Sequence, residues 1–410
     1  MAYRILGVVL AVAAIWGVAC ARSPVAPNPG ADGSPQPPPG IPGYEAIDLG
    51  TLGGSRTLPS AINDNGSIVG TSETADGRFL GFVYEGAAMR TLRASQAVYD
   101  ESADAINPSG QVGGVVRDER TLVRWNHGIQ DAPDLQILAT PASPAPPPAR
   151  VVAINSGGDM LVSLDDGVAR ASAVVMHGGV LQDLGGLGEG GGARVSTYPL
   201  AWNERGQVVG TSLVRHVAPT YDVSHPFIWD SGVMRDLGVL GVLTCGDPAE
   251  DCAGGAAVDI NAIGTVVGTV TAAAGLDRAF IWQDGVMHDL GVFEGHSTRA
   301  IAINDRGQVL FSVGFPDLGV FVWENGGVQR VGPAGGGGGG GGGGLQIWGR
   351  ALGENGAVVG EMQSSDGTVH AFVWQARTLI DLGPGCATAI NARGDVIGTD
   401  GLRGMLWRKK

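Results

Sequence analysis

The chain has 410 residues, of which 70 are Gly and 23 are Pro, and its formal net charge is −14. This much Gly together with 44% hydrophobic residues excludes a coiled coil, a collagen helix with Gly at every third position, and a generally disordered chain. The acidic balance argues against nucleic acid as a partner, and the only lysines, Lys409 and Lys410, exclude a lysine-based phosphate loop in the body of the chain.

The N-terminus is predicted to direct export. Arg4 precedes an apolar run over residues 5–19, which is too short to span a bilayer comfortably and is typical of a secretory signal peptide. We therefore predict a signal peptide over 1–20. Cys20 at its end resembles the lipidated Cys of a bacterial lipoprotein, and the alternative is ordinary signal cleavage after Ala21.

A proline-rich stretch follows the signal. Residues 21–43 contain eight prolines and lack an apolar face, so they are predicted to form an extended, semi-rigid tether. A lipid anchor and a tether together predict a lipoprotein of the outer membrane or cell surface, whose membrane contact is the anchor alone. Ordinary cleavage predicts a periplasmic or secreted protein instead.

One sequence unit recurs eight times from residue 44 onwards. Each copy begins with Ile-Asn or a variant of it, and Gly follows three residues after the Asn position. A second Gly comes four residues later in six copies, while Val162 and Phe311 replace it in the other two. An apolar run ending in an aromatic follows, as in 280–282, and then a Gly turn and Asp-Leu-Gly, as in 289–291. The Asn position holds Asn63, Asn107, Asn155, Asn203, Asn261, Asn304, Gly353 and Asn391.

This unit predicts a propeller blade. Its length of roughly 47 residues suits four short strands joined by turns, and Asn-x-x-Gly between apolar runs is typical of a tight hairpin turn. The last copy ends at Trp407 without its Asp-Leu-Gly strand, whereas an unmatched Asp-Leu-Gly occupies 48–50. We therefore predict that 44–410 form an all-β, closed β-propeller in which the N-terminal strand completes the last blade. Eight four-stranded blades are predicted, and seven are the alternative.

The unit resembles the HAF family of bacterial extracellular repeat proteins, named after the His-Ala-Phe triplet found here at 370–372. His-Pro-Phe at 225–227 and Arg-Ala-Phe at 278–280 stand at the equivalent positions of two other copies. The resemblance covers nearly the whole repeat region. It implies an extracellular repeat protein and transfers no catalytic residue.

Variable loops indicate where a ligand would bind. The turns after the first and third strands of a unit are short in most copies, whereas the other two connections vary in length. Alternating strands place the variable connections on one face, and binding residues are common on loops carried by a rigid scaffold. Arginines there suit carboxylates or sulfates, and aromatic rings suit sugars. The candidate ligand-binding residues are Arg56, Tyr99, Arg194, Tyr198, His296, Arg299, Trp348 and Arg350.

No cofactor and no metal site is expected. The histidines are scattered without a metal-binding spacing, and the carboxylates of Asp-Leu-Gly are predicted to cap turns rather than to bind cations. The Asn-x-x-Gly segments are likewise predicted to be turns and not calcium loops. In an exported protein Cys245 and Cys252 are predicted to form a disulfide, which leaves Cys386 as a buried small residue.

These features predict a non-enzymatic, monomeric binding module whose partner is a glycan, a peptide or another envelope protein. One alternative is a polysaccharide lyase or hydrolase with an acid–base pair at the channel mouth. The other is a structural component of the cell surface. Clustered carboxylates with perturbed pKa values near the channel would favour the enzyme.

Overall fold

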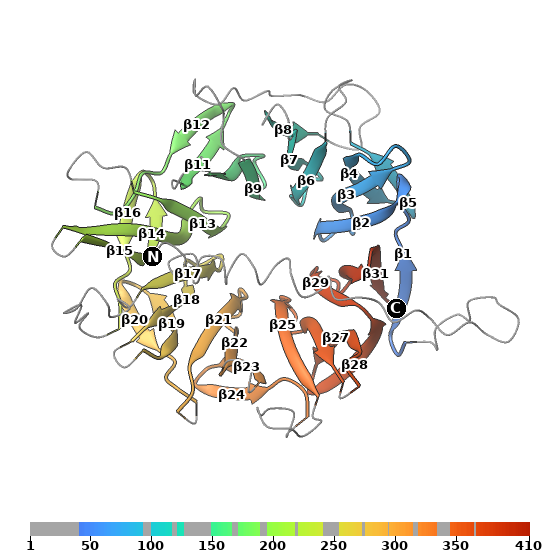
Figure 1. Ribbon diagram of the computed structural model, residues 1–410. Coiled ribbons are helices and arrows are strands. Elements are labelled where there is room, and N and C mark those ends of the chain that lie inside the picture. The colour runs from blue at the N-terminus through green and yellow to red at the C-terminus, as the bar shows by residue number, and fades with distance from the viewer. Residues whose placement is uncertain are drawn as a thin grey trace, which may run out of the picture.

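The computed structural model describes residues 41–92, 100–116, 121–126, 149–165, 171–188, 195–217, 220–240, 254–272, 275–293, 295–314, 319–333, 345–364 and 366–410. These residues form eight antiparallel sheets arranged in a ring about a central axis, which is an eight-bladed β-propeller (Figure 1). Seven sheets have four strands, and one has three within the described ranges. The predicted all-β fold and blade number are confirmed. The described part of the chain contains no helix of the length and apolarity that crossing a bilayer requires.

The blades follow one another in chain order, and within each blade the chain runs from the innermost strand outwards. Blade 1 comprises β2 (Gly53–Ile62), β3 (Ile68–Thr74), β4 (Phe79–Glu85) and β5 (Ala88–Thr91). Blade 2 comprises β6 (Glu101–Ile106), β7 (Val112–Val116) and β8 (Thr121–Trp125). Blade 3 comprises β9 (Ala149–Ile154), β10 (Met160–Asp165), β11 (Ala171–His177) and β12 (Val180–Asp183). Blade 4 comprises β13 (Thr197–Trp202), β14 (Val208–Val217), β15 (Thr220–Asp230) and β16 (Val233–Asp236).

The second half of the ring repeats this order. Blade 5 comprises β17 (Gly255–Ile260), β18 (Val266–Thr271), β19 (Asp277–Gln283) and β20 (Val286–Asp289). Blade 6 comprises β21 (Thr298–Ile303), β22 (Val309–Val313), β23 (Gly319–Glu324) and β24 (Gly327–Arg330). Blade 7 comprises β25 (Gln346–Leu352), β26 (Val358–Gln363), β27 (Val369–Gln375) and β28 (Thr378–Pro384). Blade 8 comprises β29 (Cys386–Ile390), β30 (Val396–Asp400), β31 (Arg403–Lys409) and, from the other end of the chain, β1 (Tyr44–Asp48).

The N-terminal strand closes the ring, as the sequence predicts. β1 pairs antiparallel with β31, from Tyr44 opposite Lys409 to Asp48 opposite Met405. Tyr44 is buried in the core shared by blades 7 and 8. Because β1 and β31 complete one sheet, the described strands close into a ring without an open seam between the first and last blades.

The two faces of the ring differ in the length of their connections. On one face, each turn after an inner strand has five residues, as at 63–67, and each described turn after a third strand has two, as at 86–87. We call this the turn face. The opposite face, which we call the loop face, carries connections that range from one residue at 385 to 18 residues over 237–254. The predicted segregation of length variation to one face is confirmed for the described strands.

A steric requirement explains the second Gly of the repeat. A Cβ on Gly268 would lie 2.3 Å from the carbonyl oxygen of Ala256 on the inner strand and 2.5 Å from the ring Cζ of Phe280 on the third strand. The blade is therefore too tight for any side chain at this position. In blade 6 the replacement Phe311 is buried and stacks on Phe321 with ring centroids 5.7 Å apart.

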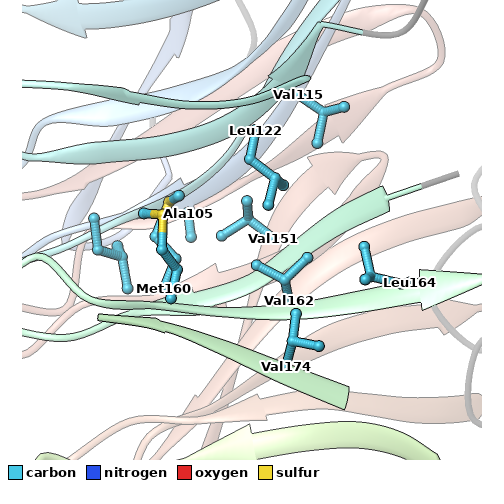
Figure 2. Packing of buried hydrophobic residues seen from close by; sticks show 10 residues of the cluster. Ala105, Val115, Leu122, Val151, Met160, Val162, Leu164 and Val174 are labelled. Atoms are coloured by element: carbon cyan, nitrogen blue, oxygen red, sulfur yellow. The ribbon is translucent and has the colours of Figure 1, made fainter. Parts of the chain in front are cut away.

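The hydrophobic core lies between neighbouring blades. Figure 2 shows one such cluster, in which Ala105 and Leu122 of blade 2 meet Val151, Met160 and Val162 of blade 3. Each blade thus buries both of its faces against its neighbours. The side chains that remain accessible are those near the axis, on the two ends of the ring and on the outer rim.

Candidate ligand-binding face

Asparagine side chains link the turns of neighbouring blades on the turn face. The side-chain oxygen of Asn63 accepts hydrogen bonds from the amides of Asn65 and Ser67 within its own turn. Its Nδ2 donates to the carbonyl oxygen of Asn107 in the next blade, at 3.1 Å. Asn391 donates to the carbonyl of Asn63 at 3.0 Å and so carries the ring across the closure. The same bond to the next blade is made by Asn107, Asn203, Asn261 and Asn304.

The Asn-x-x-Gly segments are therefore turns, and the side-chain oxygen of the asparagine stabilises each turn by accepting hydrogen bonds from backbone amides. Among the described residues there is no group of three or more His, Cys, Asp or Glu side chains placed to hold a metal ion.

The Asp-Leu-Gly carboxylates cap turns, as predicted. In Asp381 one oxygen accepts the amide of Gly383 at 2.7 Å, while the other lies 2.8 Å from Nδ1 of His370. His370 is the first residue of His-Ala-Phe, so the two motifs of the repeat form one cross-strand pair that holds the outer strand. The same double contact is made by Asp236 with Gly238 and His225, and by Asp289 with Gly291 and Arg278.

The His225 contact also affects ionisation. Burial raises the pKa of Asp236, but the hydrogen bonds from His225 and from the Gly238 amide outweigh it and hold that pKa below its usual value. The carboxylate is thus kept ionised for its capping role.

A group of carboxylates lies near the axis towards the turn face, and sequence reasoning missed it. The residue before Ile-Asn or its variant is Ala in seven blades and Asp259 in blade 5. Its two oxygens accept the amides of Ile260 and, across the blade boundary, Ile303, both at 2.9 Å. Burial, reinforced by the negative charges of Glu354 and Asp305, raises the pKa of Asp259 to about 6. Aligning the eight inner strands would have revealed this exception.

Glu354 belongs to the same group. Burial is the main cause that raises its pKa, and the charges of Asp305 and Asp64 add to the effect. One of its oxygens accepts the amide of Asp305 at 3.0 Å, just as Asp64 accepts the amide of Ala392 at 2.8 Å. These carboxylates therefore link the turns of adjacent blades.

The predicted binding residues lie on different parts of the blades and not all on the loops. Arg56 is exposed on β2, and His296 is exposed in a turn where its amide donates to the carbonyl of Phe293. The expectation that the candidates lie on loops is therefore wrong for Arg56, and it is also wrong for the remaining described candidates, because they too belong to inner strands. These residues are Tyr198 on β13, Arg299 on β21, and Trp348 and Arg350 on β25. Tyr99, Arg194, Cys20, Cys245 and Cys252 lie outside the described residues, and Cys386 is buried as predicted.

Two of the candidate arginines are held by carboxylates. Nη2 of Arg350 on β25 lies 2.6 Å from Oε1 of Glu361 on β26, and both side chains are largely buried. Arg299 contacts Oδ2 of Asp277 through Nε at 2.7 Å and Nη2 at 2.6 Å. Arg350 is thus part of the blade packing, whereas Arg299 keeps a side chain that is 41% exposed.

The inner strands bring several candidates to one level. Tyr198, Arg299 and Trp348 each lie four residues before the last residue of their inner strand, near its loop-face end. Each stands opposite the residue that follows the second Gly position, as Tyr198 does with Thr211. We call this position the inner tier. Around the ring it holds Leu58, Ser102, Arg150, Tyr198, Ala256, Arg299, Trp348 and Cys386.

No protein-family model and no curated protein matches this chain. Among solved structures it is similar to the β-propeller domain of the Trilobed protease from Pyrococcus furiosus, with 12% identity, a TM-score of 0.49, and coverage of 80% of this chain and 95% of that one. It is also similar to a puromycin-hydrolyzing peptidase of Mycobacterium tuberculosis, with 12% identity, a TM-score of 0.42, and coverage of 87% and 52%. A third similar structure is TolB from Acinetobacter baumannii, with 14% identity, a TM-score of 0.34, and coverage of 58% and 60%. The chain thus spans only about half of the peptidase. These similarities concern the fold alone.

Proposed function

We propose that this protein is an exported, envelope-anchored propeller of the HAF kind that binds a partner through its loop face without catalysing a reaction. The observation that supports this proposal is the difference between the two faces of the ring in the lengths of their connections. On the turn face, each of the two kinds of described connection has a fixed length, and six of the eight inner turns are tied to the next blade by an asparagine hydrogen bond, whereas the connections on the loop face vary from blade to blade. Variation on a rigid scaffold is typical of a binding surface.

The position of the chain ends supports the same arrangement. β1 starts at Tyr44, opposite Lys409, so the chain enters and leaves the fold on the turn face. A signal-derived anchor joined before residue 41 would therefore attach to the turn face. The loop face would then be directed away from the attachment point and accessible to a partner.

A pull-down with the full chain, purified through an affinity tag after Lys410, tests the binding proposal. The tag lies on the turn face and leaves the loop face accessible. The purified protein is challenged with envelope extract and a panel of polysaccharides. We expect specific capture that weakens in Trp348→Ala and persists in Arg408→Gln, a matched change of an exposed turn-face residue. Equal capture by both variants, or none by the unaltered protein, would contradict binding through the loop face.

The anchor is tested separately by Cys20→Ser. We expect the variant to lose acylation and to leave the membrane fraction, while its folded part keeps the same thermal unfolding. An unchanged membrane fraction would leave ordinary signal cleavage and a periplasmic or secreted protein.

A lyase or hydrolase is the second candidate function, and one observation favours it. Asp259 and Glu354 are carboxylates with raised pKa values near the axis, as a general acid requires. Their oxygens already accept backbone amides, which favours a structural role. Release of new sugar ends from any polysaccharide in the panel, abolished in Asp259→Asn, would establish the enzyme.

A further inference from the structure

The outer turns of the turn face, which follow the third strand of each blade, differ in charge around the ring. In blades 4, 5 and 6 the residues at the end of the third strand or in this turn include the carboxylates Asp230, Asp284 and Glu324. The cations at the equivalent positions of blades 7 and 8 are Arg377, Arg408, Lys409 and Lys410. Positive charge, including every lysine of the chain, thus gathers on two adjacent blades of a protein whose net charge is −14.

These cations surround the point at which the chain enters the fold. Nζ of Lys409 lies 3.1 Å from Oε1 of Gln375, which stands two residues before Arg377 and so joins the two blades. The amide of Lys410 donates to the carbonyl oxygen of Gly43 at 3.0 Å, and Gly43 directly precedes β1. Figure 1 shows β1 against β31, with blade 7 alongside. We call Arg377, Lys409 and Lys410 the entry patch.

The entry patch is exposed and keeps its charge. Its three side chains are exposed, and none of them forms an ion pair with another described residue. Arg408 is not counted, because Glu45 stands opposite it on β1. The carboxylate of Asp395 does not offset the patch, since one oxygen pairs with Nη2 of Arg393 at 2.8 Å. The carboxylates that link the inner turns follow the innermost strands and are therefore closer to the axis.

Arg377 is held at a strained backbone position. Its φ is 66° and that of Ala376 is 49°, so both residues of this turn are left-handed without being Gly. Each of the other described two-residue outer turns contains at least one Gly. Gly at 377 would relieve the strain but would remove the charge. Strain that persists at an exposed position is typical of a residue with a role outside the fold.

We propose that the entry patch contacts anionic headgroups of the membrane to which the protein is anchored; this inference rests on the anchor proposed above. A tether joined at Gly43 brings blades 7 and 8 next to the lipid, rather than the acidic outer turns of blades 4 to 6. Each Lys or Arg close to an anionic surface strengthens membrane binding, and such a patch supplements a lipid chain. Contact through the turn face also leaves the loop face directed away from the membrane.

Sedimentation of the full chain with lipid vesicles tests the inference. One set contains equal parts of phosphatidylglycerol and phosphatidylcholine, and pure phosphatidylcholine is the uncharged control. Apolar segments insert into both, so the readout is the ratio of the two affinities. We expect tighter binding to the anionic vesicles, lost at high salt. Arg377→Asn, which tolerates a positive φ, should lower the ratio about fivefold, and adding Lys409→Gln and Lys410→Gln should abolish the preference.

Two matched variants control for strain and for net charge. Ala376→Gly relieves the neighbouring backbone position without changing the charge. Arg235→Gln removes an equal charge from exposed β16, on the opposite side of the ring (Figure 1). Both should keep the ratio of the unaltered protein, with thermal unfolding confirming that every variant is folded. Equal affinity for the two kinds of vesicle, or an equal loss in Arg235→Gln, would overturn the entry patch.

The outcomes separate this inference from the anchor. If Cys20→Ser leaves the membrane fraction as expected but the vesicles show no preference, the anchor stands and the entry patch is overturned. If the vesicles show the preference but Cys20→Ser stays in the membrane fraction, the entry patch is supported and only the lipid anchor is overturned.

Discussion

Asp259 provides a direct test of how a buried carboxylate near the axis affects the stability of the fold. The carboxylate is held between blades 5 and 6 by the amides of Ile260 and Ile303, and it faces the carboxylates of Asp305 and Glu354. Burial raises its pKa from 3.8 to about 6, so the folded protein binds this proton more tightly than the unfolded chain does. The protonated form is therefore favoured by folding. The contribution of Asp259 to stability is greatest below the pKa of the unfolded chain and is lost as the pH rises through about 6.

The size of the effect follows from the two pKa values. Their difference corresponds to a loss of at most about 3 kcal/mol of unfolding free energy between strongly acidic and alkaline conditions. About half of this loss, about 1.5 kcal/mol, falls between about pH 5 and about pH 8. Residual access of water to the carboxylate would reduce both figures.

Asp259→Ala, which restores the residue found in the other seven blades, isolates this contribution. The variant loses two acceptors at every pH, so its absolute stability is not the readout. We expect its stability relative to the unaltered protein to increase by about 1.5 kcal/mol from about pH 5 to about pH 8, as measured by urea unfolding. Asp284→Asn removes one charge from an exposed turn and should show no such trend. Parallel pH curves for the unaltered protein and Asp259→Ala would refute the reasoning.

Three further substitutions test the packing of the blades. Gly268→Ala should lower the unfolding free energy by about 1–3 kcal/mol, measured by urea unfolding, because the new Cβ would meet the Ala256 carbonyl; an unchanged midpoint would contradict this. Arg377→Gly should raise it by about 1 kcal/mol in the same assay, since Arg377 adopts a φ of 66°, and a lower midpoint would count against this interpretation of the turn. Tyr44→Ala should cost about 3–5 kcal/mol and increase proteolysis of β1, whereas unchanged protease resistance would show that closure does not depend on Tyr44.

Local features of the repeat were predictable because their cause is local. Asn-x-x-Gly turns need a positive φ at Gly, seen at Gly66 with 84°, and the Asp-Leu-Gly carboxylates cap the amide two residues ahead. The blade number and the closing strand were also predictable, since copies are counted directly and the missing strand at one end matches the spare strand at the other.

The binding residues were harder to place because their positions depend on register. A bulge in each described inner strand shifts the pairing by one residue, as between Gly349 and Ala351, and so decides which side chains face the next blade. The pairing of Arg350 with Glu361 and of Arg299 with Asp277 follows from that register and from the approach of separate strands. Sequence spacing alone does not report such contacts.

The sequence by itself determined the strands, the turns, the eight blades and the closing strand, because each depends on short-range chemistry repeated along the chain. Only the tertiary structure decided which carboxylates share the region near the axis, which arginines are neutralised, and which residues occupy equivalent positions in the inner tier. These properties arise when inner strands of different blades, separated by about one repeat or more in sequence, are brought to a common level around one axis. The local chemistry of the repeat is shared by most of the blades. The residues that differ between blades acquire their contacts where neighbouring blades pack together.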